Sequence, residues 1–363
     1  MTDPWPFSLA QLTAGLRRYF ADSSLIIRTT EARPIAVPAA AGRAAPLRGL
    51  HVEYVAGSLG GGELRGQVLS VDCVVKEPRG VNRPGLAGGG LREVGVYRSL
   101  APQLPMQTPA LIAADPAGAW MVLEAITAEV PSAEWTAAHY QTAIRALAAL
   151  HERFWNLGED LLVYPWLARP LTTDFEIYVM AAVGAMEKMM IDDHHRLITG
   201  SVEVLTSLGQ MLTQVETMAE RLRSIPLTLL HGDYQPGYIA LQDDDELVVS
   251  DWHLAGVGPG VLDLVAFVNA ARWSRPDLPV DPEALITLYR AEMQARVGVV
   301  WTDAEWAELF DHALMWRFIQ ELLGWAANAP PADFQSQAVA LNSIWLQPVL
   351  AAVGRRLRPA LYL

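Results

Sequence analysis

The sequence predicts an α+β fold in which a smaller strand-rich part precedes a larger helical part. Up to about residue 124 the chain consists of short β-type runs broken by glycine and proline. Beyond "AITAEVP" the apolar residues recur at three- and four-residue spacing, which is typical of helices. With 363 residues, 52% of them hydrophobic, the chain can bury one large core or two adjoining cores. We therefore expect an N-terminal lobe over residues 1–124, in which residues 1–50 form an extension or extra strands, and a C-terminal lobe over residues 125–363.

Individual elements follow from local patterns. The runs "SLIIRT", "HVEYVAG", "LRGQVLSV", "CVVKEP" and "AWMVLE" indicate antiparallel, hairpin-connected strands. Ser132, Asp281 and the capping box from Thr302 to Glu305 are helix-start signals. Helices are expected over 132–155, 172–191, 201–223, 261–273, 281–296, 302–326 and 335–355.

Charge and cysteine content exclude several classes of protein. A net charge of -13 disfavours binding to nucleic acids and to anionic membranes. One cysteine, Cys73, rules out an internal disulfide and favours a reducing compartment. The start of the chain lacks a basic-then-apolar leader, and no stretch approaches the roughly 18 apolar residues that span a bilayer. We expect a soluble, cytoplasmic protein with neither a nucleic-acid nor a membrane partner.

A lysine and a glutamate in the N-terminal part form a candidate pair. In "VDCVVKEP" the alternation of a strand places Lys76 on the face opposite Cys73, where it is either a solvent-exposed lysine of an edge strand or a lysine beside an apolar floor. In "GGGLREVGVYRSL" Glu93 is expected in the first turn of a helix, where it either complements the helix dipole or holds Lys76 for contact with phosphate. The stretch from Gly57 to Leu64 either approaches phosphates with its backbone N–H groups or is an ordinary hairpin turn.

Two aspartates in the C-terminal part follow predicted strands. Asp233 ends "LTLLHGD", where a carboxylate can orient a hydroxyl proton. Asp251 ends "LVVSDW", where a hard oxygen can bind Mg²⁺. Two acids at neighbouring strand ends suit phosphoryl transfer, because one positions the nucleophile and the other holds the metal.

These motifs together resemble the aminoglycoside phosphotransferase and choline kinase-like family, which shares the protein-kinase fold. The resemblance covers roughly residues 50–270 and is carried by "VVKEP", "LREVGVYRSL", "WMVLEAI", "LAALHERFW", "HGDYQPGYI" and "VVSDWHLAGVGPGVLDLVAF". It implies a two-lobed protein-kinase-like fold with a small antiparallel-sheet N-lobe and a larger, mostly helical C-lobe. It also implies a small-molecule kinase that uses ATP or GTP with Mg²⁺ and acts on a hydroxylated acceptor.

The resemblance implies a role for each matched residue. On the nucleotide side, Lys76 contacts the α- and β-phosphates, Glu93 pairs with Lys76, and the backbone of Glu124 and Ile126 meets the adenine edge.

On the catalytic side of the same resemblance, Asp233 is the catalytic aspartate and Asp251 the main Mg²⁺ ligand. His231 braces the loop of Asp233, and Asp263 is a structural acid that ties the loops together.

One position departs from the family pattern. Tyr238 stands where the family has a metal-binding asparagine, and a phenol is a poor Mg²⁺ ligand at neutral pH. Either one metal suffices, another residue such as Gln235 contributes an oxygen, or catalysis is lost. The alternative function is therefore a catalytically impaired kinase-fold protein that binds nucleotide or ligand as a sensor or interaction module. The acids Asp243–Asp245 are interpreted as a solvated hairpin tip.

The remaining histidines and tryptophans leave the acceptor open. His151 is interpreted as a satisfied packing histidine, and His253 as a residue beside the site without a catalytic role. The pair His194–His195 next to Asp192 and Asp193 suggests metal binding, but a solvated helix end is the preferred interpretation. The acidic balance favours a cationic acceptor, and aromatic faces suit either amines or sugars.

Overall fold

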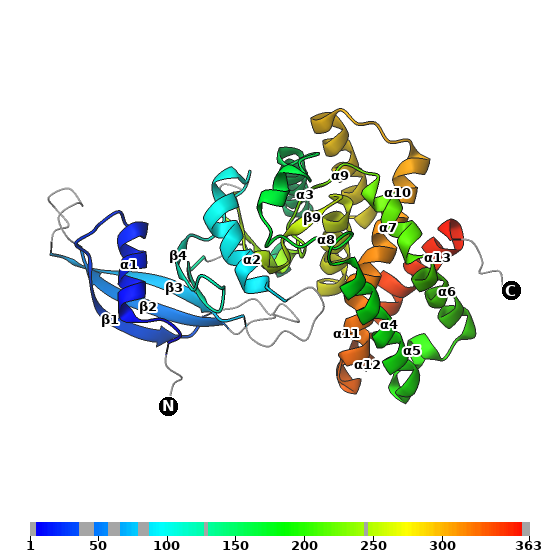
Figure 1. The fold of residues 1–363 in the computed structure, drawn as a ribbon, viewed down its shortest axis with the longest axis horizontal. Coiled ribbons are helices and arrows are strands. Elements are labelled where there is room, and N and C mark those ends of the chain that lie inside the picture. Colours follow the sequence, from blue (N-terminus) through cyan, green and yellow to red (C-terminus); the bar gives the residue numbers. More distant parts are fainter. Residues whose placement is uncertain are drawn as a thin grey trace. The chain divides into compact units, whose positions relative to one another are not determined.

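A computed structural model of the chain describes residues 5–35, 47–56, 66–78, 87–126, 130–242 and 246–357 (Figure 1). The chain forms two compact units, which we describe separately. The sheet unit comprises residues up to 81, 88–132 and 237–253, and the helical unit comprises 82–87, 133–236 and 254–363. The boundary at residue 124 that the sequence suggests stays a prediction about the domains.

The sheet unit contains a five-stranded antiparallel sheet in the order β1-β2-β3-β5-β4. The strands are β1 (Ile26–Arg33), β2 (Leu47–Val55), β3 (Val68–Lys76), β4 (Leu111–Ala114) and β5 (Met121–Glu124). β3 and β5 are neighbours, and Cys73 lies opposite Glu124 across them. This register brings the end of β3, with Lys76, beside β5.

A helix covers one face of this sheet. Helix α1 (Leu9–Tyr19) contributes Leu12 and Leu16 to a core that includes Cys73 and Val75 of β3, and α1 lies against the strands in Figure 1. Burial in this core raises the pKa of the Cys73 thiol to about 12. Sequence inspection missed α1, which falls in the region expected to be an extension or extra strands.

The sheet unit also contains a short helical segment and a β-hairpin. Helix α2 (Gly89–Gly95) continues into a π-helical turn (Val96–Leu100) and a 3-10 turn (Ala101–Gln103). Strands β7 (Ile239–Leu241) and β8 (Leu247–Val249) form a hairpin. The backbone N–H of Val249 donates to the carbonyl of Gln107 at 2.8 Å, so the hairpin is fastened to the segment before β4. The residue after β8 therefore has a fixed position in this unit.

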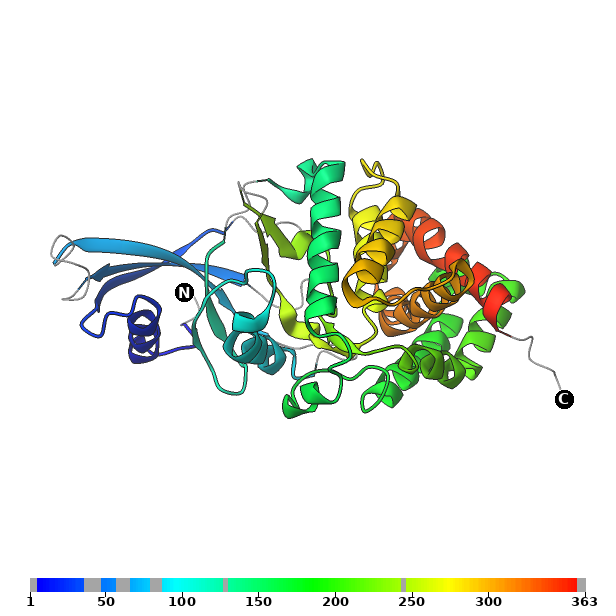
Figure 2. The same cartoon turned by 90° about the horizontal axis from the view of Figure 1, so that it is seen from above.

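The helical unit contains most of the helices and one short two-stranded pairing. β6 (Thr228–Leu230) pairs antiparallel with β9 (Gly256–Gly258). The helices are α3 (Ala137–Arg153), α4 (Phe175–Ile191), α5 (Arg196–Thr199), α6 (Val202–Thr213), α7 (Val215–Arg223), α8 (Val261–Ser274), α9 (Pro282–Val297), α10 (Asp303–Arg317), α11 (Leu323–Asn328), α12 (Pro331–Ala340) and α13 (Gln347–Arg356). π-helical turns at Phe318–Leu322 and Leu341–Leu346 join α10 to α11 and α12 to α13, and α3 lies beside α8 and α9 (Figure 2).

The observed first residues of the helices can be compared with the N-caps predicted from the sequence. Asp281 caps α9, and the Thr302–Glu305 capping box of α10 is present as predicted. Ser132 was the wrong N-cap for the first long helix: Ser132–Glu134 is a 3-10 turn, and α3 starts after Thr136. Trp135, 1% exposed, packs into the core between this turn and the helix. The predicted helix over 201–223 is two helices, with Gln214 between them.

The predicted α+β class is confirmed, since an antiparallel sheet lies in one unit and a largely helical fold forms the other. Among the helices in the described parts of the chain, none combines the length and the apolar character needed to cross a membrane.

Candidate functional site

The sheet unit holds a lysine between two acids, the buried Glu93 and the half-buried Asp251. Lys76 Nζ lies 2.6 Å from Glu93 Oε2 and contacts Asp251 Oδ1 directly. The side chain of Lys76 is 7% exposed, that of Glu93 1% and that of Asp251 13%, so the cluster has little contact with solvent. Three segments supply it: the end of β3, helix α2 and the turn after β8. The structure thus brings together three residues predicted from separate motifs.

Burial and ion pairing shift the pKa of each member of this cluster. Burial lowers the pKa of Lys76, but Asp251 and Glu93 more than compensate and the net shift is upward. Burial raises the pKa of Asp251, yet Lys76 and His253 bring it well below its usual range. For Glu93 burial dominates, and its pKa is raised despite the attraction of Lys76. Lys76 and Asp251 are consequently a charged pair at neutral pH.

Backbone and aromatic contacts fix the two acids. Glu93 is the fifth residue of α2, beyond the first turn where it was expected, and Tyr97 one turn later donates its hydroxyl to Glu93 Oε1 at 3.1 Å. The backbone N–H of Asp251 donates to the same Tyr97 hydroxyl at 3.3 Å. Asp251 has a positive φ of 70°, a conformation that residues other than glycine seldom adopt outside strained or functional positions.

His253 and Tyr238 adjoin Asp251. His253 Nδ1 lies 2.5 Å from Asp251 Oδ1. Tyr238 is buried, its carbonyl accepts from the backbone N–H of Ser250 at 2.9 Å, and its ring meets the His253 ring edge-on at 6.3 Å. Tyr238 therefore packs against the imidazole that contacts Asp251.

The predicted hinge lies at the end of β5. The backbone N–H of Glu124 donates to the carbonyl of Ala110 at 2.9 Å, and the Glu124 carboxylate accepts from the Tyr19 hydroxyl at 2.9 Å. Ile126, two residues later, is half-buried. Because its N–H is engaged, the Glu124 backbone can offer an adenine only its carbonyl oxygen.

In the helical unit, Asp233 lies on a loop with few degrees of freedom. Its backbone N–H donates to His231 Nδ1 at 3.2 Å, so His231 braces the loop as predicted. The amide of Gln235 donates to Asp233 Oδ1 at 3.2 Å. Gly232 has φ of 84°, and a Cβ there would lie 2.0 Å from the carbonyl oxygen of Leu254. Only glycine fits this turn.

One buried carboxylate holds the loop. Asp263 accepts from the backbone N–H of His231 at 2.7 Å and from that of Gly232 at 3.0 Å. His151 Nε2 lies 3.4 Å from the same carboxylate, and its Nδ1 lies 2.6 Å from the Tyr289 hydroxyl. Burial raises the pKa of Asp263, but His151, His231 and Arg317 bring it below its usual value. The predictions of a structural acid at Asp263 and of a satisfied buried His151 are confirmed.

Sequence inspection missed Arg317, at the end of α10. This arginine is 1% exposed, and its Nη1 donates to the carbonyl of Gly232 at 2.9 Å. Its Nη2 forms an ion pair with Glu321. The missed signal was an arginine within the apolar run "HALMWRFIQ", since a buried arginine requires a partner.

The predicted site residues thus divide between the two units. Lys76, Glu93 and Asp251 form one cluster in the sheet unit, whereas Asp233 lies in the helical unit and belongs to the network of Asp263. The Gly57–Leu64 stretch and the acids Asp243–Asp245 lie outside the described residues.

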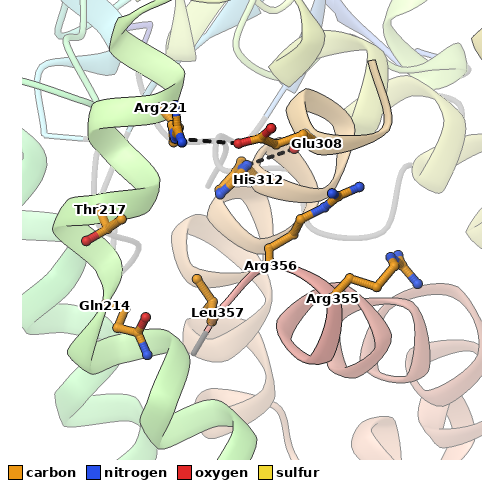
Figure 3. A pocket seen from close by; sticks show the side chains of 8 residues that line it. All are labelled: Gln214, Thr217, Arg221, Glu308, His312, Arg355, Arg356 and Leu357. Carbon is orange, nitrogen blue, oxygen red and sulfur yellow. Dashed lines mark hydrogen bonds and ion pairs between the residues drawn. The ribbon is translucent and has the colours of Figure 1, made fainter. Parts of the chain in front are cut away.

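A separate pocket of about 520 Å³ occurs in the helical unit (Figure 3). It is lined by Gln214, Thr217, Arg221, Glu308, His312, Arg355, Arg356 and Leu357. Arg221 lies 3.5 Å from Glu308, and both Arg355 and Arg356 pair with Asp311. Its cations are neutralised by local acids, and it contains none of the predicted site residues.

Comparison with protein-family models gives one match. The model described as the phosphotransferase enzyme family covers residues 72–309, a span that includes every predicted site residue from Lys76 to Asp251. A search of curated protein sequences finds no match.

Comparison with solved structures finds the same architecture. A Ralstonia eutropha protein provisionally described as an aminoglycoside phosphotransferase is 14% identical with a TM-score of 0.60, over 97% of this chain and 99% of that chain. An ethanolamine kinase from Plasmodium vivax is 11% identical with a TM-score of 0.54, over 90% and 81%. A spectinomycin phosphotransferase, solved with ADP and spectinomycin, is 12% identical with a TM-score of 0.51, over 97% and 100%.

These findings decide the broader predictions. The resemblance to the phosphotransferases is confirmed by the family match, and the kinase-like fold by the structural likeness. The prediction of a phosphotransferase that acts on a hydroxyl group is confirmed at the level of the family. The impaired, binding-only alternative is not favoured.

Proposed function

Because the chain belongs to the phosphotransferase enzyme family, we propose that it transfers the γ-phosphate of ATP or GTP to a hydroxyl group of a small molecule. The observation that carries the proposal is the contact of Lys76 with both Glu93 and Asp251. A lysine held by an acid can present its ammonium to phosphate oxygens in a fixed position. An acid beside it can hold the metal that those phosphates bring.

Lys76, held in position by Glu93, would contact the nucleotide phosphates. Glu93 is itself fixed by Tyr97, so the ammonium keeps its position if Asp251 turns to another partner. The Glu124 carbonyl and the Ile126 N–H would meet the adenine edge, in keeping with the engaged N–H of Glu124. In this proposal Lys76 changes partners on binding, from a carboxylate to phosphate.

Asp251 would hold Mg²⁺. Among the described residues, the side chains of Lys76 and His253 both contact Oδ1 of Asp251. Oδ2 is therefore the oxygen that can bind a cation. A carboxylate oxygen is the donor that Mg²⁺ prefers, so the residues fit the ion. When bound, Mg²⁺ supplies neutralisation of the charge that develops on the transferred phosphoryl group.

Asp233 would accept or orient the proton of the attacking hydroxyl. Its loop is preorganised by the Asp263 carboxylate and by Arg317, so the carboxylate keeps its direction without substrate. A fixed base contributes typically about 10²–10⁴-fold to a rate.

The acceptor would be a small hydroxylated and cationic compound. The net charge of -13 attracts cations at long range. Spectinomycin and ethanolamine, named for two structures of the same fold, are amines that carry hydroxyl groups. Aminoglycosides, amino alcohols and amino sugars are therefore the first acceptors to test.

The test has two steps, of which the first concerns the donor. Millimolar ATP or GTP with Mg²⁺ should raise the melting temperature, since a ligand at 100 times its Kd stabilises by about 2.7 kcal/mol. Lys76→Met should remove most of this shift. Lys188→Met is the matched control, because the chain has only these two lysines and Lys188 lies on α4, where it bonds Asn328. Equal shifts in both variants would refute the nucleotide role of Lys76.

The second step measures phosphate transfer across the acceptor panel with the donor that binds. Asp233→Asn should lower kcat by at least about 100-fold. Asp277→Asn, at an aspartate that is 88% exposed, should leave kcat unchanged. Full turnover in Asp233→Asn would remove that residue from its proposed role.

A further inference from the structure

Three potential metal ligands gather where α4 ends and α5 begins. Asp192, His194 and His195 each offer a ligand atom, and these atoms lie within 4.8 Å of one another. All three belong to the helical unit, on a segment that the proposed phosphotransfer does not use. Sequence inspection interpreted this segment as a solvated helix end.

That interpretation is wrong for His195, which is fully buried. The expectation rested on adjacent helical side chains pointing apart. Residues Asp193–His195 instead form a 3-10 turn between the two helices, and the rings of His194 and His195 lie with their centroids 3.8 Å apart. The local backbone therefore places two imidazoles side by side.

The hydrogen bonding of His195 determines which nitrogen is available. Its Nε2 lies 2.8 Å from the carbonyl oxygen of Ala326 in α11, and a carbonyl only accepts, so Nε2 carries the proton. Nδ1 then has a lone pair, and it is buried without a hydrogen-bond partner among the described residues. A histidine that donates one N–H to a backbone carbonyl and leaves its other nitrogen unpaired has the arrangement of a metal ligand.

The other two groups can close around an ion at that nitrogen. A tetrahedral zinc site with bonds of about 2.0–2.1 Å separates its ligand atoms by roughly 3.3 Å. Asp192 and His194 are only half-buried, so their side chains can make this adjustment, whereas His195 is held between Ala326 and the ring of Phe334, whose centroid is 5.0 Å away. The carboxylate of Asp192 forms no ion pair with a described residue. The nearby Lys188 bonds Asn328 instead.

We propose that Asp192, His194 and His195 bind a divalent transition-metal ion, with zinc as the ion that two imidazoles and one carboxylate suit best. His195 binds through Nδ1, and solvent completes the coordination shell on the half-buried side. The ion fastens the turn between α4 and α5, and through the His195 bond to Ala326 it joins this turn to α11. Its role is structural, because no residue of the phosphotransfer cluster takes part.

The experiment measures Zn²⁺ binding to the chelator-treated full chain by competition with a chromophoric chelator, in excess Mg²⁺. The wild-type chain should bind one Zn²⁺, and Co²⁺ in its place should give the visible absorption of a low-coordinate site. His194→Ala and Asp192→Asn should each weaken Zn²⁺ binding by at least about 100-fold, since the loss of a direct ligand exceeds the 10- to 100-fold effect of outer contacts. Both residues are half-buried, so these variants should fold.

Two controls localise the ion. His139→Gln changes a histidine in the capping box of α3 and should leave Zn²⁺ affinity unchanged, because glutamine can also accept from the cap N–H. Asp251→Asn should bind Zn²⁺ as the wild type does, which separates this site from the proposed Mg²⁺ ligand. Absence of Zn²⁺ binding, or binding that survives both His194→Ala and Asp192→Asn, would overturn the proposal. Neither result would affect the phosphotransferase assignment.

Discussion

Two aspartates, the half-buried Asp251 in the sheet unit and the buried Asp263 in the helical unit, have pKa values below the usual range for different reasons. Asp251 is partnered by side-chain groups, Lys76 and His253. Asp263 receives two backbone N–H groups from the loop of Asp233, and His151 approaches it at 3.4 Å. In both, burial works against the charge and the partners outweigh it.

The difference separates an exchangeable charge from a scaffold. A lysine side chain can release a carboxylate and take up phosphate, because its four-carbon stem rotates. Backbone N–H groups cannot leave without unfolding the loop that they belong to. In the sheet unit, a metal and a nucleotide can therefore separate the charged pair of Lys76 and Asp251. In the helical unit, the charge of Asp263 instead fixes the loop that carries Asp233.

The largest expected effect is on catalysis at Asp251. Asp251→Asn should lower kcat by about 1,000-fold, or about 4 kcal/mol of transition-state stabilisation, because it removes the charge that would hold Mg²⁺. Stability should fall as well, because the lowered pKa of Asp251 means that its charge contributes to folding at neutral pH. The loss should be smaller than at Asp263, since Lys76 keeps Glu93 and asparagine tolerates the positive φ at this position better than most residues. Phosphate transfer at saturating substrates and thermal unfolding measure the two quantities.

Asp72→Asn is the matched control in the same unit, at an aspartate whose side chain is 60% exposed, and it should leave kcat intact. If Asp251→Asn unfolded the protein as readily as a change at Asp263, the distinction between exchangeable charge and scaffold would fail.

The next effect is on stability at Asp263. Asp263→Asn should cost about 3 kcal/mol of unfolding free energy, because the amide keeps one acceptor oxygen and turns an N–H₂ group toward buried donors. Urea unfolding measures it, and Asp277→Asn should stay within about 0.5 kcal/mol of the wild type. A change at Asp263 that lowered activity and left stability intact would place this acid in the chemistry.

Lys76 and Asp251 could be recognised in the sequence because one ends a strand and the other follows a strand. The structure brings both together with Glu93, and the roles assigned to these residues stay predictions. Strand alternation gave the opposite faces of Cys73 and Lys76, and cap chemistry gave the start of α10. The chain has two lysines among 27 basic residues, and one of them is buried Lys76, a signal that sequence inspection did not use. Where arginine serves elsewhere, a retained lysine points to a position that needs a compact cation.

The features that were missed depend on distant contacts. Helix α1 carries a capping box at Ser8 and a narrow apolar stripe, but only the sheet beneath it shows that the stripe is buried. The burial of His195 follows from Ala326 and Phe334, more than 130 residues away in sequence. Local periodicity contains no information about such partners.

The smallest effect concerns the pH dependence of stability and contrasts Asp263 in the helical unit with Glu93 in the sheet unit. The folded-state pKa of Asp263 lies below its unfolded value of about 3.9, so the stability that this carboxylate contributes is present above that value. It is lost as the pH falls from there toward the folded-state pKa. Each such group changes the unfolding free energy by at most about 1.4 kcal/mol per pH unit.

The difference in melting temperature between wild type and Asp263→Asn should therefore be largest at pH 7 and should narrow between pH 4 and pH 3. The groups that face this carboxylate and lower its pKa are His151, through a hydrogen bond, and His231 and Arg317. Glu93 should behave in the opposite sense, because its folded-state pKa is raised. The wild type should therefore lose stability as the pH rises from the unfolded value of about 4.3 toward the folded-state pKa, and Glu93→Gln should lose stability less steeply over that range. If the difference in melting temperature between wild type and Asp263→Asn stayed constant down to pH 3, the charge of this carboxylate would not contribute to stability.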